Sequence, residues 1–148
     1  MQTGLLLVVA ALAFDVDLPT SLDRWFTFGW VFVLGLATSA LLGVALSAVP
    51  RSGRSATAVV IPIVLFLQFV SGVYLPFTIL PGWLQNLASV FPLKWIAEGM
   101  RHVFLPDEFR FAEQGHSWNL AGIAIALGIW LVVGLILARA TFRWTRRD

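Results

Sequence analysis

The chain has 148 residues, of which 59% are hydrophobic and 12% are charged, and its mean hydropathy is +0.86. Soluble domains carry about 25% charged residues, so this composition excludes a disordered chain, a nucleic-acid-binding module and almost any soluble enzyme. The lack of cysteine excludes a disulfide scaffold or a thiolate metal site. The net charge is +2, and four of the basic residues crowd the last ten positions: Arg139, Arg143, Arg146 and Arg147. A basic cluster beside an apolar segment predicts an integral membrane protein before it predicts a nucleic-acid-binding surface.

Four apolar segments follow one another along the chain, and the first is the shortest. Residues 2–14 carry no charge and would form a helix of about 20 Å, which is too short to cross a bilayer. That length suits an incomplete span or the core of a signal peptide, but no lysine or arginine precedes the segment. We favour a span whose beginning lies outside this chain, with the signal peptide as the alternative.

The other three segments are each long enough to cross a membrane. They comprise residues 25–49, 56–75 and 120–138. The first of them is uncharged and would extend about 37 Å as a helix, which exceeds the roughly 30 Å hydrocarbon core of a bilayer. We predict an all-α, polytopic fold with one transmembrane domain over residues 1–148, built from three full spans and the incomplete N-terminal one.

Two of these spans carry features that predict contacts inside the membrane. Segment 25–49 has a small residue at every fourth position, which predicts helix packing more than a pore lining, because small residues let another helix approach closely. These residues are Gly35, Ser39, Gly43 and Ser47. Segment 56–75 places Gln68 and Ser71 on one helix face, where they would bond to another helix or to a polar part of a substrate. The middle of each span lacks an ionisable residue, which argues against a proton-coupled carrier.

Residues 76–118 are too apolar for a solvated loop and contain two short amphipathic patterns. Pro81 opens the first pattern, and Pro92, well placed in a first helical turn, opens the second. The resulting helix pair, over residues 81–104, is too short to cross the bilayer. We expect it to lie at the outer interface, or to dip into the membrane and return.

The second helix of this pair carries three charges on one face. Lys94, Glu98 and Arg101 follow one another at helical spacing, so Glu98 can pair with either cation. We interpret them as the solvated face of an interfacial helix, in preference to a direct role with a substrate.

The arginines predict the orientation of the chain. The loop of residues 50–55 holds Arg51 and Arg54, and the C-terminal tail holds four more arginines. Such residues favour the cytoplasmic side, so we expect this loop and the C-terminus in the cytoplasm.

Motifs for catalysis or energy conversion are missing from the sequence. It has neither a G-x-x-x-x-G-K-[ST] phosphate loop nor a G-x-S-x-G nucleophile elbow. His102 and His116 lack metal-ligand spacing and are interpreted as interfacial residues. We therefore expect a non-catalytic chain with no cofactor and no metal.

Residues 65–104 resemble the signature region of ABC-2 type transporter permeases, especially drug-exporter permeases of the daunorubicin-resistance kind. The upstream string GVALSAVPRSGRSA is also similar to that family. The matching residues occur in the family's order and comprise Phe69, Ser71, Gly72, Tyr74, Pro76, Pro81, Trp83, Pro92, Glu98 and Arg101.

The resemblance implies the C-terminal half of a six-span permease in a bacterial plasma membrane, with a re-entrant helix pair before the last span. It implies a partner ATPase, a second permease copy (identical or different) and export of a drug, lipid or glycan, with no nucleic acid involved. The family's first two spans and coupling helices are missing from this sequence, so we expect a fragment, a mis-started frame or a degenerate gene. A small self-contained channel or carrier, or a non-transporting assembly protein, is the alternative function.

Overall fold

The computed structural model describes residues 4, 19, 21–47 and 53–141. All secondary structure among these residues is helical, which confirms the predicted all-α class. In chain order the elements are α2 (Leu22–Leu46), α3 (Gly53–Val70), η1 (Phe77–Ile79), α4 (Gly82–Ser89), α5 (Pro92–Phe104), η2 (Asp107–Ala112), η3 (Gln114–His116) and α6 (Leu120–Thr141). The predicted segment 2–14 lies outside the described residues.

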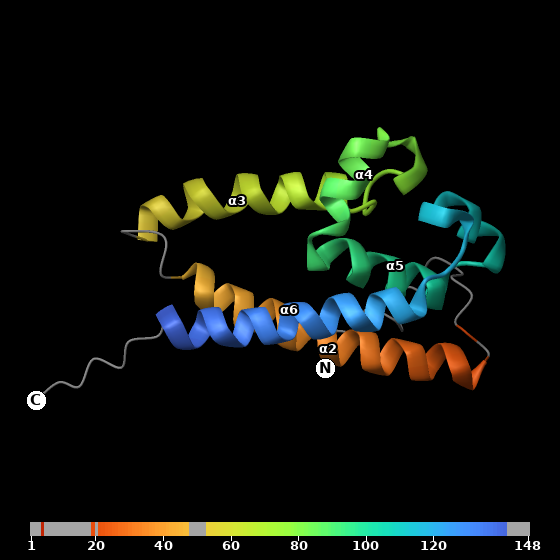
Figure 1. The fold of residues 1–148 in the computed structure, drawn as a ribbon, viewed down its shortest axis with the longest axis horizontal. Coiled ribbons are helices and arrows are strands. Elements are labelled where there is room, and N and C mark those ends of the chain that lie inside the picture. Colours follow the sequence, from red (N-terminus) through yellow and green to blue (C-terminus); the bar gives the residue numbers. More distant parts are fainter. Residues whose placement is uncertain (1–3, 5–18, 20, 48–52, 142–148) are drawn as a thin grey trace, which may run out of the picture.

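Two long apolar helices form the frame of the molecule. α2 and α6 lie side by side along its long axis and run in the same direction (Figure 1). Both are long and apolar enough to cross a membrane, with mean hydropathies of 2.0 and 2.7 in their most apolar windows. They correspond to the predicted segments 25–49 and 120–138, although α2 begins three residues earlier and α6 ends three residues later.

α3 corresponds to the third predicted span, but it begins at Gly53, three residues earlier than predicted and within the predicted loop 50–55, and it also ends earlier. The helix ends at Val70, five residues before the expected end at Leu75. Gly72 adopts a positive φ of 78°, a backbone conformation that does not continue a right-handed helix. The described apolar part of α3, Val60–Val70, falls short of the length needed to cross a bilayer by itself.

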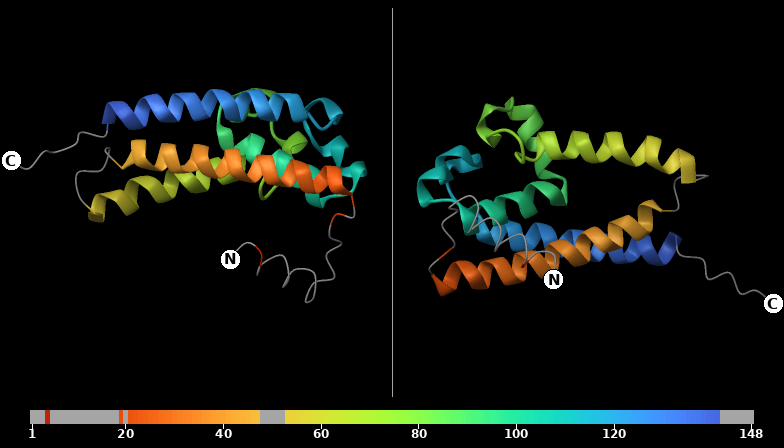
Figure 2. Two further views of the ribbon diagram at one scale, coloured as in Figure 1. Left: turned by 90° about the horizontal axis from the view of Figure 1, so that it is seen from below. Right: turned by 180° about the vertical axis from the view of Figure 1, so that it is seen from behind.

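The predicted helix pair is present as α4 and α5, and Pro92 is the first residue of α5 as expected. Figure 2 shows from two further sides that this pair lies along the half of the molecule where α2 and α6 begin. α5 packs against both long helices. The fully buried core consists of Val31 from α2 with Ile123 and Leu127 from α6, and Trp95, Ile96 and Met100 of α5 cover it.

Glycine allows α5 to approach α2 closely. A Cβ atom added at Gly99 would lie 2.8 Å from Val31 Cγ1, and one added at Gly35 would lie 3.2 Å from Ile96 Cγ1. Gly35 belongs to the predicted small-residue stripe, whereas the sequence pattern alone did not single out Gly99. The two positions set the distance between the helices.

α3 is attached to the rest of the molecule mainly through its last turn. Between Val60 and Phe66 the described side chains are exposed, whereas Val70 is buried against Phe77 and Ala88. Figure 1 shows α3 separated from α2 along most of its length. The C-terminal end of α3 therefore positions the turn that leads into the helix pair.

Candidate functional site

Four charged side chains form two ion pairs along α5. We call them the charge cluster: Lys94, Glu98, Arg101 and Glu113. The first three come from α5, and Glu113 lies between η2 and η3. Lys94 and Glu98 are 2% and 1% exposed, and Glu113 is 2% exposed. Burying ionised groups costs several kcal/mol each unless they are paired and hydrogen-bonded, so the partners of each group explain how it is tolerated.

Lys94 and Glu98 pair with each other one helical turn apart. Lys94 Nζ lies 2.5 Å from Glu98 Oε2 and 3.8 Å from the centre of the Trp95 ring. The second carboxylate oxygen of Glu98 accepts a hydrogen bond of 3.1 Å from the backbone N–H of Asn119, just before α6. Glu98 therefore ties α5 to the beginning of α6.

Arg101 forms the second ion pair and reaches a third segment. Its Nε and Nη2 atoms donate to the two carboxylate oxygens of Glu113 at 2.5 and 3.1 Å, a bidentate arrangement that fixes both groups. Its Nη1 atom donates to the carbonyl of Gly72 at 2.9 Å. One guanidinium group thus joins α5, the loop after it and the turn that ends α3.

This burial corrects the interpretation of the charges on α5 as a solvated face. The helix is covered on both sides, because its apolar face meets α2 and α6 while Phe77 and the loop containing Glu113 cover its charged face. Helical periodicity shows that the charges share a face, but it does not show what packs on that face. The signal that sequence reasoning missed is Glu113, an acid in a polar-looking loop.

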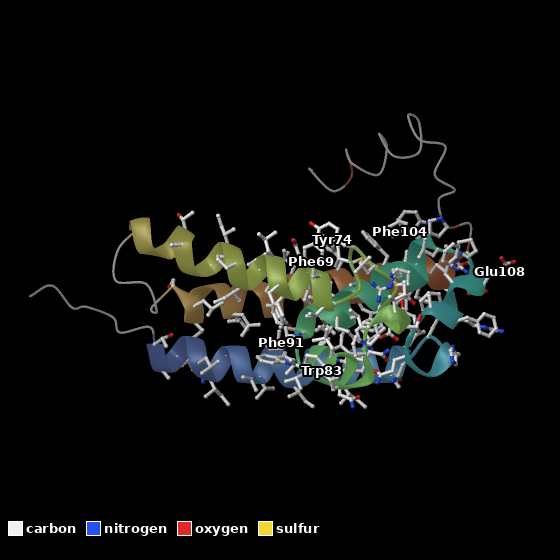
Figure 3. The ribbon with its side chains drawn as sticks, turned by 90° about the horizontal axis from the view of Figure 1, so that it is seen from above. Phe69, Tyr74, Trp83, Phe91, Phe104 and Glu108 are labelled. Carbon is white, nitrogen blue, oxygen red and sulfur yellow. The ribbon has the colours of Figure 1, made fainter. Side chains whose placement is uncertain are left out.

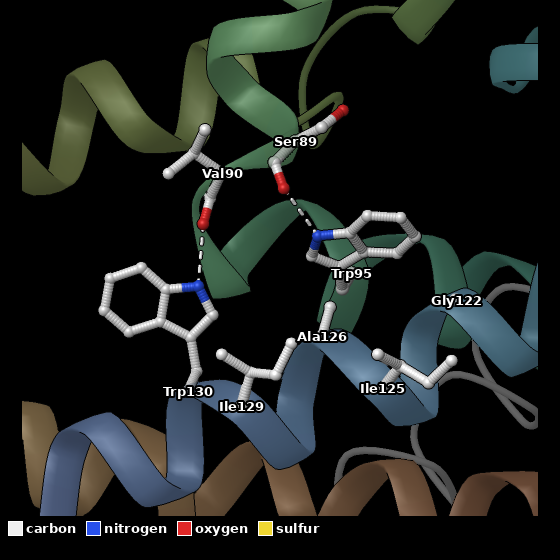
Figure 4. Close-up of a pocket in the computed structure, with 8 residues that line it drawn as sticks. All are labelled: Ser89, Val90, Trp95, Gly122, Ile125, Ala126, Ile129 and Trp130. Atoms are coloured by element: carbon white, nitrogen blue, oxygen red, sulfur yellow. Dashed lines mark hydrogen bonds between the residues drawn. The ribbon is translucent and has the colours of Figure 1, made fainter.

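The turn between α4 and α5 is held by two indole groups. Trp95 Nε1 donates to the carbonyl of Ser89 at 2.8 Å, and Trp130 Nε1 donates to the carbonyl of Val90 at 2.7 Å (Figure 4). Carbonyls at the end of a helix lack partners within that helix, and leaving them unpaired in an apolar environment is costly. Trp130 lies midway along α6, so the turn is anchored beside the middle of that helix.

The family model described as ABC-2 type transporter matches residues 1–105, more than two thirds of the chain. The chain belongs to the ABC-2 type transporter family. This confirms the resemblance carried by residues 65–104.

Curated relatives of this ABC-2 family chain are named as permeases. A protein called "Putative transport permease ycf38" from Porphyra purpurea is 27% identical over 131 residues, which cover 87% of this chain and 45% of that protein. A protein of the same name from Pyropia yezoensis is 28% identical over 133 residues, covering 90% and 46%. The chain therefore spans slightly less than half the length of these relatives. No solved structure matches it.

The first residues of the family motif, from Phe69 to Trp83, lie around the turn between α3 and α4. The rings of Phe69 and Tyr74 lie side by side, with centres 5.1 Å apart (Figure 3). The Tyr74 hydroxyl donates to Gln68 Oε1 at 3.2 Å, and Ser71 Oγ donates to the Gln68 carbonyl at 3.2 Å. The bonds described for Gln68 and Ser71 are thus local, within the end of α3 and its following turn.

Pro76, Pro81 and Trp83 of the motif lie at or near the beginnings of short helices. Pro76 and Pro81 precede η1 and α4, and the carbonyl of Pro81 accepts hydrogen bonds from the N–H groups of Leu84 and Gln85. Trp83 is 69% exposed on α4. These residues shape the turns, whereas Glu98 and Arg101 enter the charge cluster.

Only the beginning of the predicted small-residue stripe is packed within the described part of this ABC-2 chain. Gly35 meets Ile96, but Ser39, Gly43 and Ser47 are exposed, and a Cβ added at Gly43 would meet nothing within 4 Å. The prediction that this face packs against another helix stays a prediction.

The two histidines differ in environment. His102 packs edge-on against Trp118, with ring centres 5.4 Å apart, and neither ring nitrogen has a hydrogen-bond partner among the described residues. Burial lowers the pKa of His102, and the nearby Arg24 guanidinium lowers it further. His116 is exposed, and its Nδ1 lies 2.9 Å from the Phe111 carbonyl. Within the described residues, no three His, Cys, Asp or Glu side chains gather in a way that could hold a metal ion.

Proposed function

We propose that this chain forms part of the permease subunit of an ABC-2 type exporter. The observation that carries the proposal is the family match over residues 1–105, which supports a place for the chain in a membrane transport subunit. A partner ATPase would supply the energy, and a second permease copy would complete the path. The substrate would be a drug, lipid or glycan moved outward across a bacterial plasma membrane; the bacterial source comes from the resemblance alone, since the relatives are algal.

We further propose that α4 and α5 form a re-entrant pair that enters from the outer face. The hydrogen bond from Trp130 to the Val90 carbonyl supports this placement. Trp130 lies ten residues into α6, so the turn between α4 and α5 would sit about 15 Å below the beginning of that helix. Backbone that enters the membrane without crossing it must be shielded from lipid by protein. The charge cluster would provide part of this shielding, because it fixes α5 against its neighbours.

The proposed orientation places the beginnings of α2 and α6 outside and the C-terminus in the cytoplasm. It is supported by Arg51, which precedes α3, by Arg54 at the beginning of α3, and by the four arginines of the last ten residues, of which Arg139 lies in the last turn of α6. These two arginine-rich segments would face the ATPase.

The proposed function can be tested in membrane vesicles from the source organism. Inverted vesicles would be prepared with the gene intact or deleted, and ATP-driven accumulation of amphiphilic dyes would be measured. We expect ATP-dependent accumulation that deletion abolishes, and co-purification of the tagged protein with an ATPase that contains a phosphate-binding loop. Flux that persists without ATP would favour the self-contained channel or carrier. Unchanged flux on deletion and no associated ATPase would favour an assembly protein, and either result would overturn the exporter.

A further inference from the structure

A cavity of about 250 Å³ lies between the α4–α5 turn and α6. Figure 4 shows the residues around it, which come from the end of α4, from α5 and from the first half of α6. They are Ser89, Val90, Trp95, Gly122, Ile125, Ala126, Ile129 and Trp130. The cavity is distinct from the charge cluster, because Lys94, Glu98, Arg101 and Glu113 do not line it.

The polar hydrogen donors of the cavity wall are already used. The N–H groups of Trp95 and Trp130 both donate to carbonyls of the turn, and the Ser89 hydroxyl donates to the Gln85 carbonyl. The remaining lining side chains are aliphatic. The wall therefore has no free donor for a ligand that accepts hydrogen bonds, such as a carboxylate or phosphate, whereas an apolar group would gain contacts.

The cavity opens onto the apolar outer surface of α6. Ile125 and Ile129, at its edge, are 64% and 58% exposed, and α6 is one of the two described helices that are long and apolar enough to cross a membrane. If this face of α6 meets lipid when the helix crosses a bilayer, the medium itself supplies the ligand. At about 30 Å³ for each methylene-sized group, the volume accommodates about eight such groups.

From these observations we propose that the cavity binds one acyl chain of a bilayer phospholipid. The chain packs between the two indole rings and fills the space below the turn, so that lipid forms part of the support of the helix pair. The inference requires that α6 crosses the membrane and that this face of α6 meets lipid in the assembled transporter, and it does not depend on the transported substrate.

The test uses the full chain in phosphatidylcholine vesicles that contain a trace of phospholipid with a photoreactive diazirine in one acyl chain. After illumination, mass spectrometry locates the labelled residues. Ala126→Phe fills the cavity, and Ala126→Leu fills it more mildly in case the larger residue prevents folding. Ala124→Phe is the matched control, because Ala124 is exposed on α6 and lies outside the cavity.

We expect labelling of Trp95 and Ile129 in the unmodified chain and in Ala124→Phe. In Ala126→Phe this labelling should fall about tenfold, since filling the site removes at least two methylene-sized contacts from the bound chain. The proposal would be overturned if labelling at the cavity stayed unchanged in both Ala126 variants, or if it were no stronger than labelling at the exposed Ile136. Either result would still be consistent with α6 in the membrane. Lack of label anywhere on α6 would instead overturn the membrane placement on which the proposed function also rests.

Discussion

Arg101 shows how one side chain can link three segments that the sequence separates widely. Its partners are Gly72 and Glu113, 29 and 12 residues away. Gly72 contributes through its positive φ of 78°, a backbone conformation that glycine adopts without strain and that places its carbonyl where Arg101 Nη1 can donate to it. The guanidinium group suits this place, since its planar fork can serve a carboxylate and a carbonyl at once.

Replacing Arg101 by glutamine should therefore be strongly destabilising. Arg101→Gln leaves Glu113 buried without its cation, so we expect the free energy of unfolding to fall by about 3 kcal/mol. Unfolding in mixed micelles measures this change. Arg110→Gln is the control, because Arg110 is exposed, and it should cost less than about 1 kcal/mol. If the double variant Arg101→Gln with Glu113→Gln is as unstable as the single one, the two side chains are not coupled.

The stability of the folded protein depends on pH through His102. Burial, and then the charge of Arg24, lower its pKa in the folded protein, although Asp107 and Asp23 act in the opposite direction. The unfolded chain, with an ordinary histidine pKa of about 6.5, therefore takes up the proton first as the pH falls. The stability contributed by neutral His102 is fully present above that value and is lost below it.

We expect the unmodified chain to lose more thermal stability than His102→Phe between about pH 7.5 and about pH 5. Phenylalanine keeps a ring against Trp118 and cannot be protonated. Melting temperatures in detergent at several pH values measure the difference. His116→Asn, at an exposed site with a positive φ of 55° that asparagine tolerates, should melt with the pH dependence of the unmodified chain. If the melting temperatures of His102→Phe and of the unmodified chain changed with pH in parallel, His102 would not be the source of the pH dependence.

At the scale of elements, the crossing of α2 and α5 depends on Gly99. A methyl group there would meet Val31, a stiff β-branched residue that cannot move aside easily. Gly99→Ala should therefore lower the free energy of unfolding by about 1–3 kcal/mol. Gly29→Ala, on α2 with open space around it, should be neutral or stabilising by up to about 1 kcal/mol.

A double variant tests whether contact with Val31 causes the loss of stability expected for Gly99→Ala. Val31→Ala makes room for the methyl group, so the double variant with Gly99→Ala should be more stable than the sum of the two single effects predicts. Additive effects would show that Gly99 matters for a reason other than this contact.

The position of the α4–α5 turn depends on Trp130. Trp130→Phe keeps an aromatic ring but removes the donor to the Val90 carbonyl, at an expected cost of about 1–3 kcal/mol. Mass spectrometry should detect faster amide hydrogen exchange in peptides that cover α4 and the beginning of α5. Trp83→Phe makes the same change at an exposed position of α4 and should leave exchange unchanged. Equal exchange in the two variants would show that the indole does not hold the turn.

For the whole molecule, the charge distribution predicts which end faces outward. Cysteines placed one at a time as Ser52→Cys and Asp107→Cys should react with an impermeant thiol reagent from opposite sides of the membrane. Ser52 lies outside the described residues, so this expectation comes from the arginines of its loop alone. In intact cells Asp107→Cys should be labelled, and labelling of Ser52→Cys from outside would reverse the proposed orientation.

Local features of the sequence were sufficient for the class of protein and for most helix positions. Uncharged stretches of membrane length predicted α2 and α6, because hydropathy depends only on neighbouring residues. Pro81 and Pro92 marked the beginnings of α4 and α5, because proline restricts its own backbone whatever packs on it. The spacing of the motif from Phe69 to Arg101 was specific enough to indicate the ABC-2 family.

Only the tertiary structure decided what covers each helix. The end of α3, predicted at Leu75, lies at Val70, shortly before Gly72 takes a positive φ. The charges of α5 are buried because a loop brings Glu113 onto them, and the α4–α5 turn is held because Trp130 lies beside Val90, 40 residues earlier in the chain. Helical periodicity records which side chains share a face, but the environment of that face depends on residues distant in sequence. For this reason the membrane helices could be predicted from the sequence, whereas the buried charge cluster could not.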